Sequence, residues 1–182
     1  MTNSERGWAP VRPLVLCTVG TDHHRFDRLV RWCDSFAAAH PDAAVFVQYG
    51  SSAPPQVAAG EAYWDKDQLA LLLSGAHVVI THGGPGSIGD ARRAGTRPIV
   101  IPRDPVRGEH VDDHQIRFVA RLASRGLVVA VGSEAELHKA VRRQLTSPRG
   151  SGVDREADDA RVRASALRFG ALVERLVSQP RR

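Results

Sequence analysis

A glycine-rich loop at residues 82–87, with the sequence HGGPGS, has the residue types that hold a diphosphate. Glycines let the backbone approach an anion closely, and the start of a following helix offers unpaired N–H groups with positive partial charge. Ser87 adds a hydroxyl group and His82 a further hydrogen-bond donor. The same residues also fit an ordinary helix start in which Ser87 and Asp90 form a capping box. The two interpretations are compatible, because helix caps and anion sites use the same unpaired amides.

A second polar cluster, EHVDDHQ at residues 109–115, suits the recognition of hydroxyl groups. Asp112, His114 and Gln115 supply the hydrogen-bond donors and acceptors that a sugar ring requires. His110 and His114 are four residues apart, a spacing that can bind zinc, but the H-E-x-x-H arrangement is absent and no third ligand is evident. We therefore expect no metal, and a plain acidic helix start is the simpler alternative to hydroxyl recognition.

A third polar group, GTDHH at residues 20–24, follows the first apolar run. Its amides and Thr21 can line a cleft, and His23 or His24 has the chemistry of a general base. Solvent-exposed loop histidines are the simpler interpretation. The segment QYGS at residues 48–51 ends another apolar run and leaves the same two interpretations open.

Three common motifs of enzymes are missing from the chain. It has no G-x-S-x-G, no G-x-x-x-x-G-K-[ST], and no G-x-G-x-x-G after the first apolar run. The last absence counts against an ordinary NAD-binding domain.

Apolar runs alternate with helical spacings along the chain and predict the elements that position these polar groups. We expect strands at residues 14–19, 44–48, 62–64, 78–80, 98–101 and 127–131. We expect helices at residues 26–40, 67–73, 87–94, 112–124 and 134–145. In the fourth helix the residues predicted to face the core are Ile116, Val119, Ala120 and Ala123. The alternation predicts an α/β fold with a doubly wound, Rossmann-like parallel sheet of about six strands. Ligands bind such sheets at the carboxyl ends of the strands, where all three polar groups fall.

Composition narrows the class of protein. With 182 residues, 42% of them hydrophobic, the chain is long enough for one main domain. Its net charge of +5 permits phosphate-bearing ligands, anionic lipid surfaces or nucleic acid. Aromatic residues make up 5% of the chain and do not alternate with arginines, which argues against nucleic acid. We expect a flexible N-terminus at 1–12, a ligand-binding domain at 13–146, a linker at 147–154 and an Arg-rich helix and tail at 155–182.

The cysteines and the terminal segments bear on the compartment. Cys17 and Cys33 lie on predicted apolar faces, which favours buried thiols over a disulfide. The first 13 residues lack the apolar core of a signal peptide. No run approaches the ~20 apolar residues of a membrane span. We therefore expect a cytoplasmic protein that reaches the inner face of a membrane only through a partner.

Together these segments resemble the C-terminal, nucleotide-sugar-binding half of family 28 glycosyltransferases, whose two-domain architecture is the GT-B fold. The likeness is strongest to short proteins that contain only this half, in two-subunit UDP-sugar transferases of N-glycan assembly and of bacterial exopolysaccharide or capsule synthesis. The matching segments are residues 19–21 with 26–29, 81–88, 102–103 and 108–115. The likeness covers roughly residues 14–145, and the order and spacing of the four segments make it more specific than any single loop.

The resemblance implies roles for the matching positions. It implies a diphosphate site at Gly20, Thr21, His82, Gly83, Gly84, Gly86 and Ser87. It implies donor-sugar contacts at Glu109, His110, His114 and Gln115. Asp90 would bind the ribose, although the wider family often has Glu there, and Trp64 and Lys66 would meet the base. A similar plant signature has an acid where this chain has His114, so the donor sugar is left open.

A complete GT-B enzyme needs a second domain that binds the acceptor and usually supplies the general base. The resemblance therefore implies a donor-binding subunit that works with a separate, membrane-associated partner. The expected reaction is inverting transfer from a UDP-sugar to a lipid-linked saccharide or polysaccharide, without a cofactor. The Arg-rich segment at 155–182 would dock the partner or an anionic membrane surface, and the simpler alternative is a helix that packs on the sheet of its own domain.

Three other functions stay open at this point. One is a stand-alone, homo-oligomeric transferase with Asp22, His23 or His24 as the base. Another is a nucleotide-sugar-binding regulatory protein without catalysis. The last is a metal-dependent hydrolase at His110 and His114.

Overall fold

The computed structural model describes residues 12–148 together with positions 153, 160, 163, 164, 167, 168 and 171. The chain divides into two units, Met1–Gly152 and Val153–Arg182. In the second unit, the backbone is helical at positions 160, 163, 164, 167, 168 and 171. The expected N-terminal segment, linker and Arg-rich helix lie largely outside the described residues.

A six-stranded sheet forms the centre of the first unit, with the strand order β3-β2-β1-β4-β5-β6. The strands are β1 (Leu14–Thr18), β2 (Ala44–Gln48), β3 (Ala59–Glu61), β4 (Val78–His82), β5 (Ile99–Ile101) and β6 (Val129–Ala130). Every neighbouring pair in this sheet is parallel. The chain order reverses between β1 and β4, which is the position where ligands bind in doubly wound sheets.

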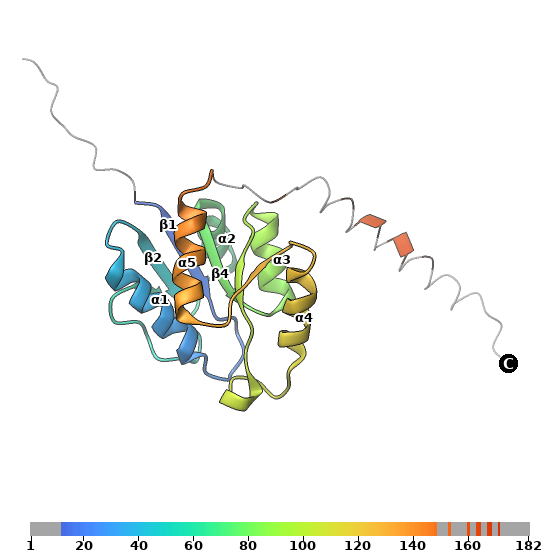
Figure 1. Ribbon diagram of the computed structural model, residues 1–182, viewed down its shortest axis with the longest axis horizontal. Helices are drawn as coiled ribbons and strands as arrows, with labels where there is room; N and C mark the ends of the chain where they lie inside the picture. Colours follow the sequence, from blue (N-terminus) through green and yellow to red (C-terminus); the bar gives the residue numbers. More distant parts are fainter. Residues whose placement is uncertain are drawn as a thin grey trace, which may run out of the picture. The chain divides into compact units, whose positions relative to one another are not determined.

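Helices cover both faces of the sheet (Figure 1). They are α1 (Asp27–Ala39), α2 (Lys66–Gly75), α3 (Pro85–Arg93), α4 (His114–Ala123) and α5 (Glu134–Leu145), with a short 3-10 turn, η1 (Pro105–Arg107). Alternate residues of β1 enter different cores: Val15 and Cys17 pack with α1 and α5, whereas Leu16 packs with α2 and α3. The α4 helix packs on the α3 side through Val119. The expected α/β fold with about six parallel strands is confirmed.

Most predicted strands agree with the structure, but β3 does not. The strands that begin at residues 14, 44, 78 and 99 match their predictions within two residues, and α5 matches at both ends. The third strand spans 59–61 rather than 62–64, and β6 is only two residues long. The α2 helix begins at Lys66, because the Asp65 carboxylate accepts from the Gln68 amide in a capping box that the prediction missed.

Half of the predicted inward face of α4 is confirmed: Val119 is buried, and Ala123 packs against the same core cluster. The other half is wrong, because Ile116 is 39% exposed and Ala120 is exposed, whereas Gln115 is buried. A buried polar side chain occupies the first inward position, which the apolar pattern alone could not indicate.

Cys17 and Cys33 are both buried and form no disulfide, as expected. Within the described ranges, no helix has the length and apolar character needed to cross a membrane.

Candidate functional site

A cavity of about 420 Å³ lies at the carboxyl ends of β1, β2 and β4, where these strands meet the starts of α2 and α3. Eight of its lining residues belong to the predicted site: Gly20, Thr21, Trp64, His82, Gly84, Gly86, Ser87 and Asp90. Gln48 belongs to the segment that the prediction left open, and Pro85 lies within the predicted glycine-rich loop; the remaining lining residues, Thr18, Leu69 and Leu73, were not assigned to the site. The fold thus brings residues that are far apart in the sequence into one hollow, which we call the donor cavity.

The His82 ring is enclosed by the backbone on two sides. Gly20 has a φ of +83°, and a Cβ at this position would come within 2.5 Å of the His82 ring. A Cβ at Gly84 would overlap the same ring. These two glycines are therefore required by the imidazole itself, whether or not a ligand is bound.

His82 is a neutral side chain at physiological pH. Burial, with a smaller contribution from the nearby Arg103 guanidinium, lowers the pKa of His82 from 6.5 to about 4. A neutral imidazole donates one hydrogen bond and contributes no positive charge. Any anion in the donor cavity must therefore be held mainly by backbone N–H groups and hydroxyls.

The start of α3 provides such groups. Gly84 is the N-cap and Pro85 is the first helical residue, so the first intrahelical bond runs from the Ile88 N–H to the Gly84 carbonyl at 3.1 Å. Among the described residues, none accepts a hydrogen bond from the amides of Gly86 and Ser87. The capping box expected at Ser87 and Asp90 is wrong, because Ser87 lies inside the helix and the helix has no side-chain cap.

Gly86 differs from the other glycines of this loop. A Cβ at Gly86 would meet no atom within 4 Å, whereas a Cβ at Gly83 would come within 2.8 Å of Gln115. The space above Gly86 is open and faces the donor cavity, so the backbone there is accessible to a ligand.

Gln115 joins the glycine loop to the end of β5. Its side-chain Oε1 accepts from the Gly83 N–H at 3.0 Å and from the Arg103 N–H at 3.2 Å, and the residue is only 4% exposed. Its side-chain nitrogen makes no hydrogen bond with the part of the chain that the structure describes. Gln115 therefore positions the loop and keeps one donor group for a ligand.

Glu109 is engaged within the protein rather than open to a sugar. Its carboxylate binds Arg28 at 2.7 and 2.8 Å and accepts from the Asp104 N–H at 2.9 Å. The Glu109 side chain is 7% exposed. The structure favours a positioning role for Glu109 over the predicted donor-sugar contact.

Arg103 organises this edge of the sheet, and the prediction gave it no role. Its guanidinium is fully buried and donates to the carbonyls of Val19, His24 and Glu109 at 2.7–3.0 Å. It thereby holds the loop after β1 against the loop after β5. In the sequence, its place after a predicted strand and within a segment that matches the family both pointed to this position, but neither gave Arg103 a role.

Two of the three residues predicted to bind the ribose and the base line the donor cavity. The Asp90 carboxylate lines the donor cavity and is paired with Arg93. Trp64 is half-buried and lines the same cavity, whereas Lys66 is exposed at the start of α2 and does not line it.

The candidate bases lie beside the donor cavity rather than in it. His24 Nδ1 is 2.6 Å from Asp22 Oδ1, and although partial burial opposes it, hydrogen bonds from His24 lower the pKa of Asp22 to about 2. His23 and His24 line a separate cavity of about 530 Å³ with Arg25, Arg31 and other residues. The histidine ring of His110 stacks on His24 with ring centroids 5.8 Å apart.

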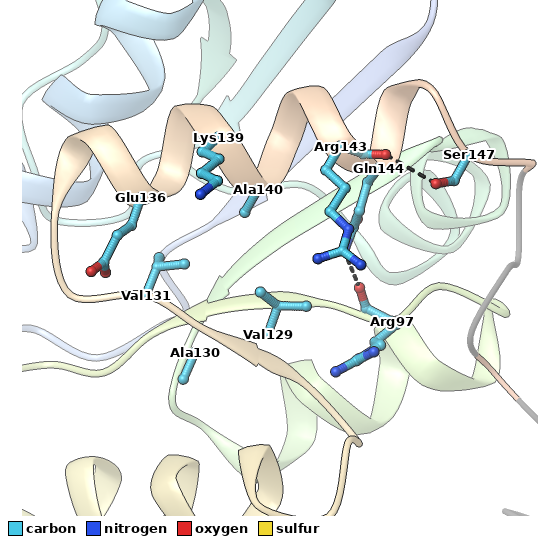
Figure 2. Close-up of a pocket in the computed structure, with 10 residues that line it drawn as sticks. All are labelled: Arg97, Val129, Ala130, Val131, Glu136, Lys139, Ala140, Arg143, Gln144 and Ser147. Carbon is cyan, nitrogen blue, oxygen red and sulfur yellow. Dashed lines mark hydrogen bonds between the residues drawn. The ribbon is translucent and has the colours of Figure 1, made fainter.

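Another cavity, of about 490 Å³, lies between β6 and α5 (Figure 2). Figure 2 shows the Arg143 side chain extending from α5 toward Arg97, whose carbonyl accepts from Gln144 at 2.9 Å, whereas the Arg97 side chain points away from the helix. None of the predicted site residues lines it. It shares no lining residue with the donor cavity, which is therefore the candidate site.

Comparison with known families gives one match that covers most of the chain. The sequence model described as the glycosyltransferase family 28 C-terminal domain matches residues 14–161.

Two curated proteins are similar over part of their length. A UDP-N-acetylglucosamine transferase subunit ALG13 from Yarrowia lipolytica is 43% identical over 56 residues, which are 31% of this chain and 26% of that protein. A UDP-N-acetylglucosamine–N-acetylmuramyl-(pentapeptide) pyrophosphoryl-undecaprenol N-acetylglucosamine transferase from a Synechococcus species is 29% identical over 118 residues, which are 62% of this chain and 32% of that protein. The chain thus spans about a third or less of these relatives.

A solved structure supports the fold. The glycotransferase of kitacinnamycin superposes with a TM-score of 0.64 at 21% sequence identity, over 96% of this chain and 47% of that one. At this level of identity the comparison concerns the fold alone.

Proposed function

The chain belongs to the glycosyltransferase family 28 C-terminal domain family, and from this premise we propose that it is the donor-binding subunit of an inverting UDP-sugar-dependent glycosyltransferase. The donor cavity carries the proposal, because it gathers eight of the predicted site residues at the strand reversal between β1 and β4. The name of one relative, a UDP-N-acetylglucosamine transferase subunit, supports a UDP-sugar as the donor.

The diphosphate of the donor would bind the first turn of α3. The unpaired amides of Gly86 and Ser87 would donate hydrogen bonds to the anion, which would also lie at the positive end of the helix dipole. Ser87 adds a hydroxyl group. Hydrogen bonds to a charged group contribute roughly 1.5–3 kcal/mol each. Because His82 is neutral, it would add one N–H donor rather than charge.

The remaining parts of the donor would extend along the same edge. Trp64 offers an aromatic surface for the base, and Asp90 would accept from the ribose hydroxyls after releasing Arg93. The free nitrogen of Gln115 and the exposed His114 ring would contact the sugar. This arrangement requires no metal or organic cofactor for transfer.

A partner subunit would complete the active site. One relative is named as a transferase subunit, which supports a partner, and two of the three candidate bases, His23 and His24, line a different cavity from the diphosphate loop. We propose that the partner is membrane-associated, binds a lipid-linked or polysaccharide acceptor and supplies the general base, which would place this chain at the cytoplasmic face. The name of the second relative, which includes a pyrophosphoryl-undecaprenol group, supports a lipid-linked acceptor.

Two glycine-to-alanine variants of α3 test donor binding. In Gly86→Ala the new methyl group meets open space, so the fold should be retained while the methyl group obstructs a diphosphate above the backbone. Calorimetric titration should show UDP affinity falling about tenfold or more, equivalent to the loss of one charged hydrogen bond.

Gly89→Ala is the matched control. It lies in the same helix but does not line the donor cavity, and its Cβ would meet only the flexible end of Arg93 at 3.2 Å. Both variants should be as stable as the parent or slightly more so, because alanine favours helices over glycine by roughly 1 kcal/mol. Equal UDP affinity in the parent and Gly86→Ala would show that the diphosphate does not bind at this loop, and it would contradict the proposed function.

A further inference from the structure

The cavity of about 530 Å³ that contains His23 and His24 has a basic lining. Two carboxylates, Asp27 and Glu109, line it, and they are outnumbered by guanidinium groups. The four arginines of the lining come from the chain before α1, from α1 itself and from η1: Arg25, Arg28, Arg31 and Arg107. We call this hollow the arginine cavity. Its size is that of a small-ligand site, which usually measures about 300–1,000 Å³, and its charge favours an anion.

Both carboxylates of the arginine cavity are already bound within the protein. Glu109 holds the bidentate pair with Arg28 described above. Asp27 accepts from Arg25 Nε at 3.0 Å and from the Ala53 N–H at 2.9 Å. A ligand in the cavity would therefore meet carboxylates whose charge is largely compensated, together with the guanidinium groups that remain.

The arginines keep hydrogen-bond donors for such a ligand. Arg28 bonds through Nε and Nη2, and its Nη1 has no acceptor in the part of the chain that the structure describes. Arg25 and Arg107 each bond through Nε alone, so their four terminal nitrogens are likewise available among the described residues. Arg31 is exposed and forms neither a hydrogen bond nor an ion pair with any described residue.

The start of α1 adds two backbone donors. The N–H groups of Asp27 and Arg28 have no acceptor within residues 12–148, and the helix has no side-chain cap. The first bonds of the helix run from Leu29 and Val30 to the Phe26 carbonyl at 3.0 and 3.3 Å. Because Asp27 and Arg28 line the arginine cavity, the positive end of the helix favours the same kind of ligand as the arginines do.

The number of available donors indicates an anion with many oxygens. A carboxylate ligand offers two oxygens and one charge, which a single guanidinium group satisfies. A diphosphate offers more acceptors and more charge, and guanidinium groups bind phosphates in bidentate pairs. Arg28 and Arg31 are three residues apart in α1, so their side chains are neighbours on one face and can bind one ligand together.

The loop after β1 connects the arginine cavity with the donor cavity. Gly20 and Thr21 line the donor cavity, His23 and His24 line the arginine cavity, and no described residue lines both. A second substrate in the arginine cavity would therefore lie next to the donor. The turn η1, which contributes one of the four arginines, also presents Val106 with 93% exposure as an apolar contact for a lipid chain.

We propose that the arginine cavity binds the diphosphate of a lipid-linked acceptor, so that this chain shares the acceptor with its partner. The identity of the acceptor rests on the proposed function, whereas the anion site rests on the arginines and the start of α1. Arg31 would bind the diphosphate without first leaving another partner, and Arg28 would use its remaining nitrogen.

Titration of the full-length protein with inorganic pyrophosphate tests the anion site. Calorimetry is performed with UDP in excess, which keeps the donor cavity occupied, and one equivalent of pyrophosphate should bind. Arg31→Ala should weaken pyrophosphate binding about tenfold or more, equivalent to the loss of one charged hydrogen bond. Because Arg31 is exposed and has no hydrogen bond or ion pair to lose among the described residues, the variant should fold, and its far-UV spectrum checks this.

Arg142→Ala is the matched control. It removes the same charge from an exposed position of α5 that lines neither cavity, and it should leave pyrophosphate binding unchanged. The anion site is wrong if pyrophosphate does not bind saturably, or if the Arg31 and Arg142 variants bind it equally well. Gly86→Ala should lose UDP affinity and keep its pyrophosphate site, so a failure of the donor site is distinguishable from a failure of the arginine cavity.

Geranyl diphosphate distinguishes a lipid-linked source from a free anion, because it carries the same diphosphate on an apolar chain. It should bind at least as tightly as pyrophosphate and should lose affinity in Arg31→Ala. If it binds about tenfold more weakly than pyrophosphate, a loss of about 1.4 kcal/mol, the cavity takes a free anion and the acceptor assignment is wrong.

Discussion

His82 is the residue on which the geometry of the donor cavity depends. Gly20 and Gly84 leave room for its ring, and burial keeps it neutral. A glycine-rich loop in a sequence is commonly attributed to a ligand, but here two of the glycines serve a side chain of the protein. In this loop only Gly86 has open space above its backbone. Gly86 is therefore the glycine of the loop that is accessible to a ligand.

The neutral state of His82 predicts a pH-dependent stability. The pKa of His82 in the folded protein is about 4, below the ordinary value of 6.5. Between these values the unfolded chain binds more protons than the folded one, so the free energy of unfolding falls as the pH is lowered from 6.5 to 4. His82 should contribute up to ~3 kcal/mol to this loss.

His82→Gln should flatten this dependence, because glutamine does not titrate. Urea unfolding at several pH values between 4 and 7 measures the slope for both proteins, and the other histidines contribute equally to each. Parallel slopes for the parent and the variant would contradict a buried, neutral His82.

Among the elements, the two loops that follow β1 and β5 depend on a buried cation. Arg103 donates to carbonyls in both loops, and an ion pair between Arg28 and Glu109 lies beside it. Arg103→Lys keeps the charge but cannot reproduce the planar set of donors. We expect a loss of roughly 3–6 kcal/mol in the free energy of unfolding, from two charged hydrogen bonds at roughly 1.5–3 kcal/mol each.

The same variant should weaken UDP binding, because the loop with Gly20 and Thr21 loses its anchor. Arg107→Lys is the control: its side chain is 61% exposed and pairs with Asp104 at the surface, so the change should be under about 0.5 kcal/mol. Denaturant unfolding and calorimetry measure both effects. Similar stability for the two lysine variants would show that Arg103 does not hold the loops.

The element boundaries show what local patterns can and cannot predict. Strands β1, β2 and β4 are readable because they are continuous apolar runs, as buried parallel strands usually are. The third strand has the sequence Ala59-Gly60-Glu61 and is fixed by pairing with β2, where a Cβ at Gly60 would come within 2.5 Å of the Val47 carbonyl. A close approach between two backbones leaves no hydrophobic periodicity in the sequence. The prediction therefore placed the strand in the adjacent, more apolar residues 62–64.

The site was predictable to the same degree. The residues at strand ends could be assigned to one edge because parallel strands place their carboxyl ends together. The role of Arg103 could not be predicted, because two of its hydrogen-bond partners are 79 and 84 residues away in the sequence. Local signals that were present but unused are Pro85 as a first helical residue and the Asp65–Gln68 capping box.

For the whole molecule, the donor cavity and all six strands of the described sheet lie before residue 149. The first unit ends at Gly152, and the second unit, Val153–Arg182, contains the Arg-rich segment to which we assign docking. Donor binding and docking should therefore be separable. A protein that ends at Gly152 should bind UDP within about twofold of the full chain, because every residue that lines the donor cavity belongs to the first unit.

The same truncated protein should lose binding to the partner or to vesicles with anionic lipids, since juxtamembrane basic residues contribute roughly 1 kcal/mol each near such a surface. Calorimetry with UDP and co-sedimentation with vesicles measure the two properties separately. Retained partner and vesicle binding would end the docking role of the Arg-rich segment while leaving the donor site intact. Loss of UDP binding in a folded, truncated protein would instead show that the second unit takes part in the donor site.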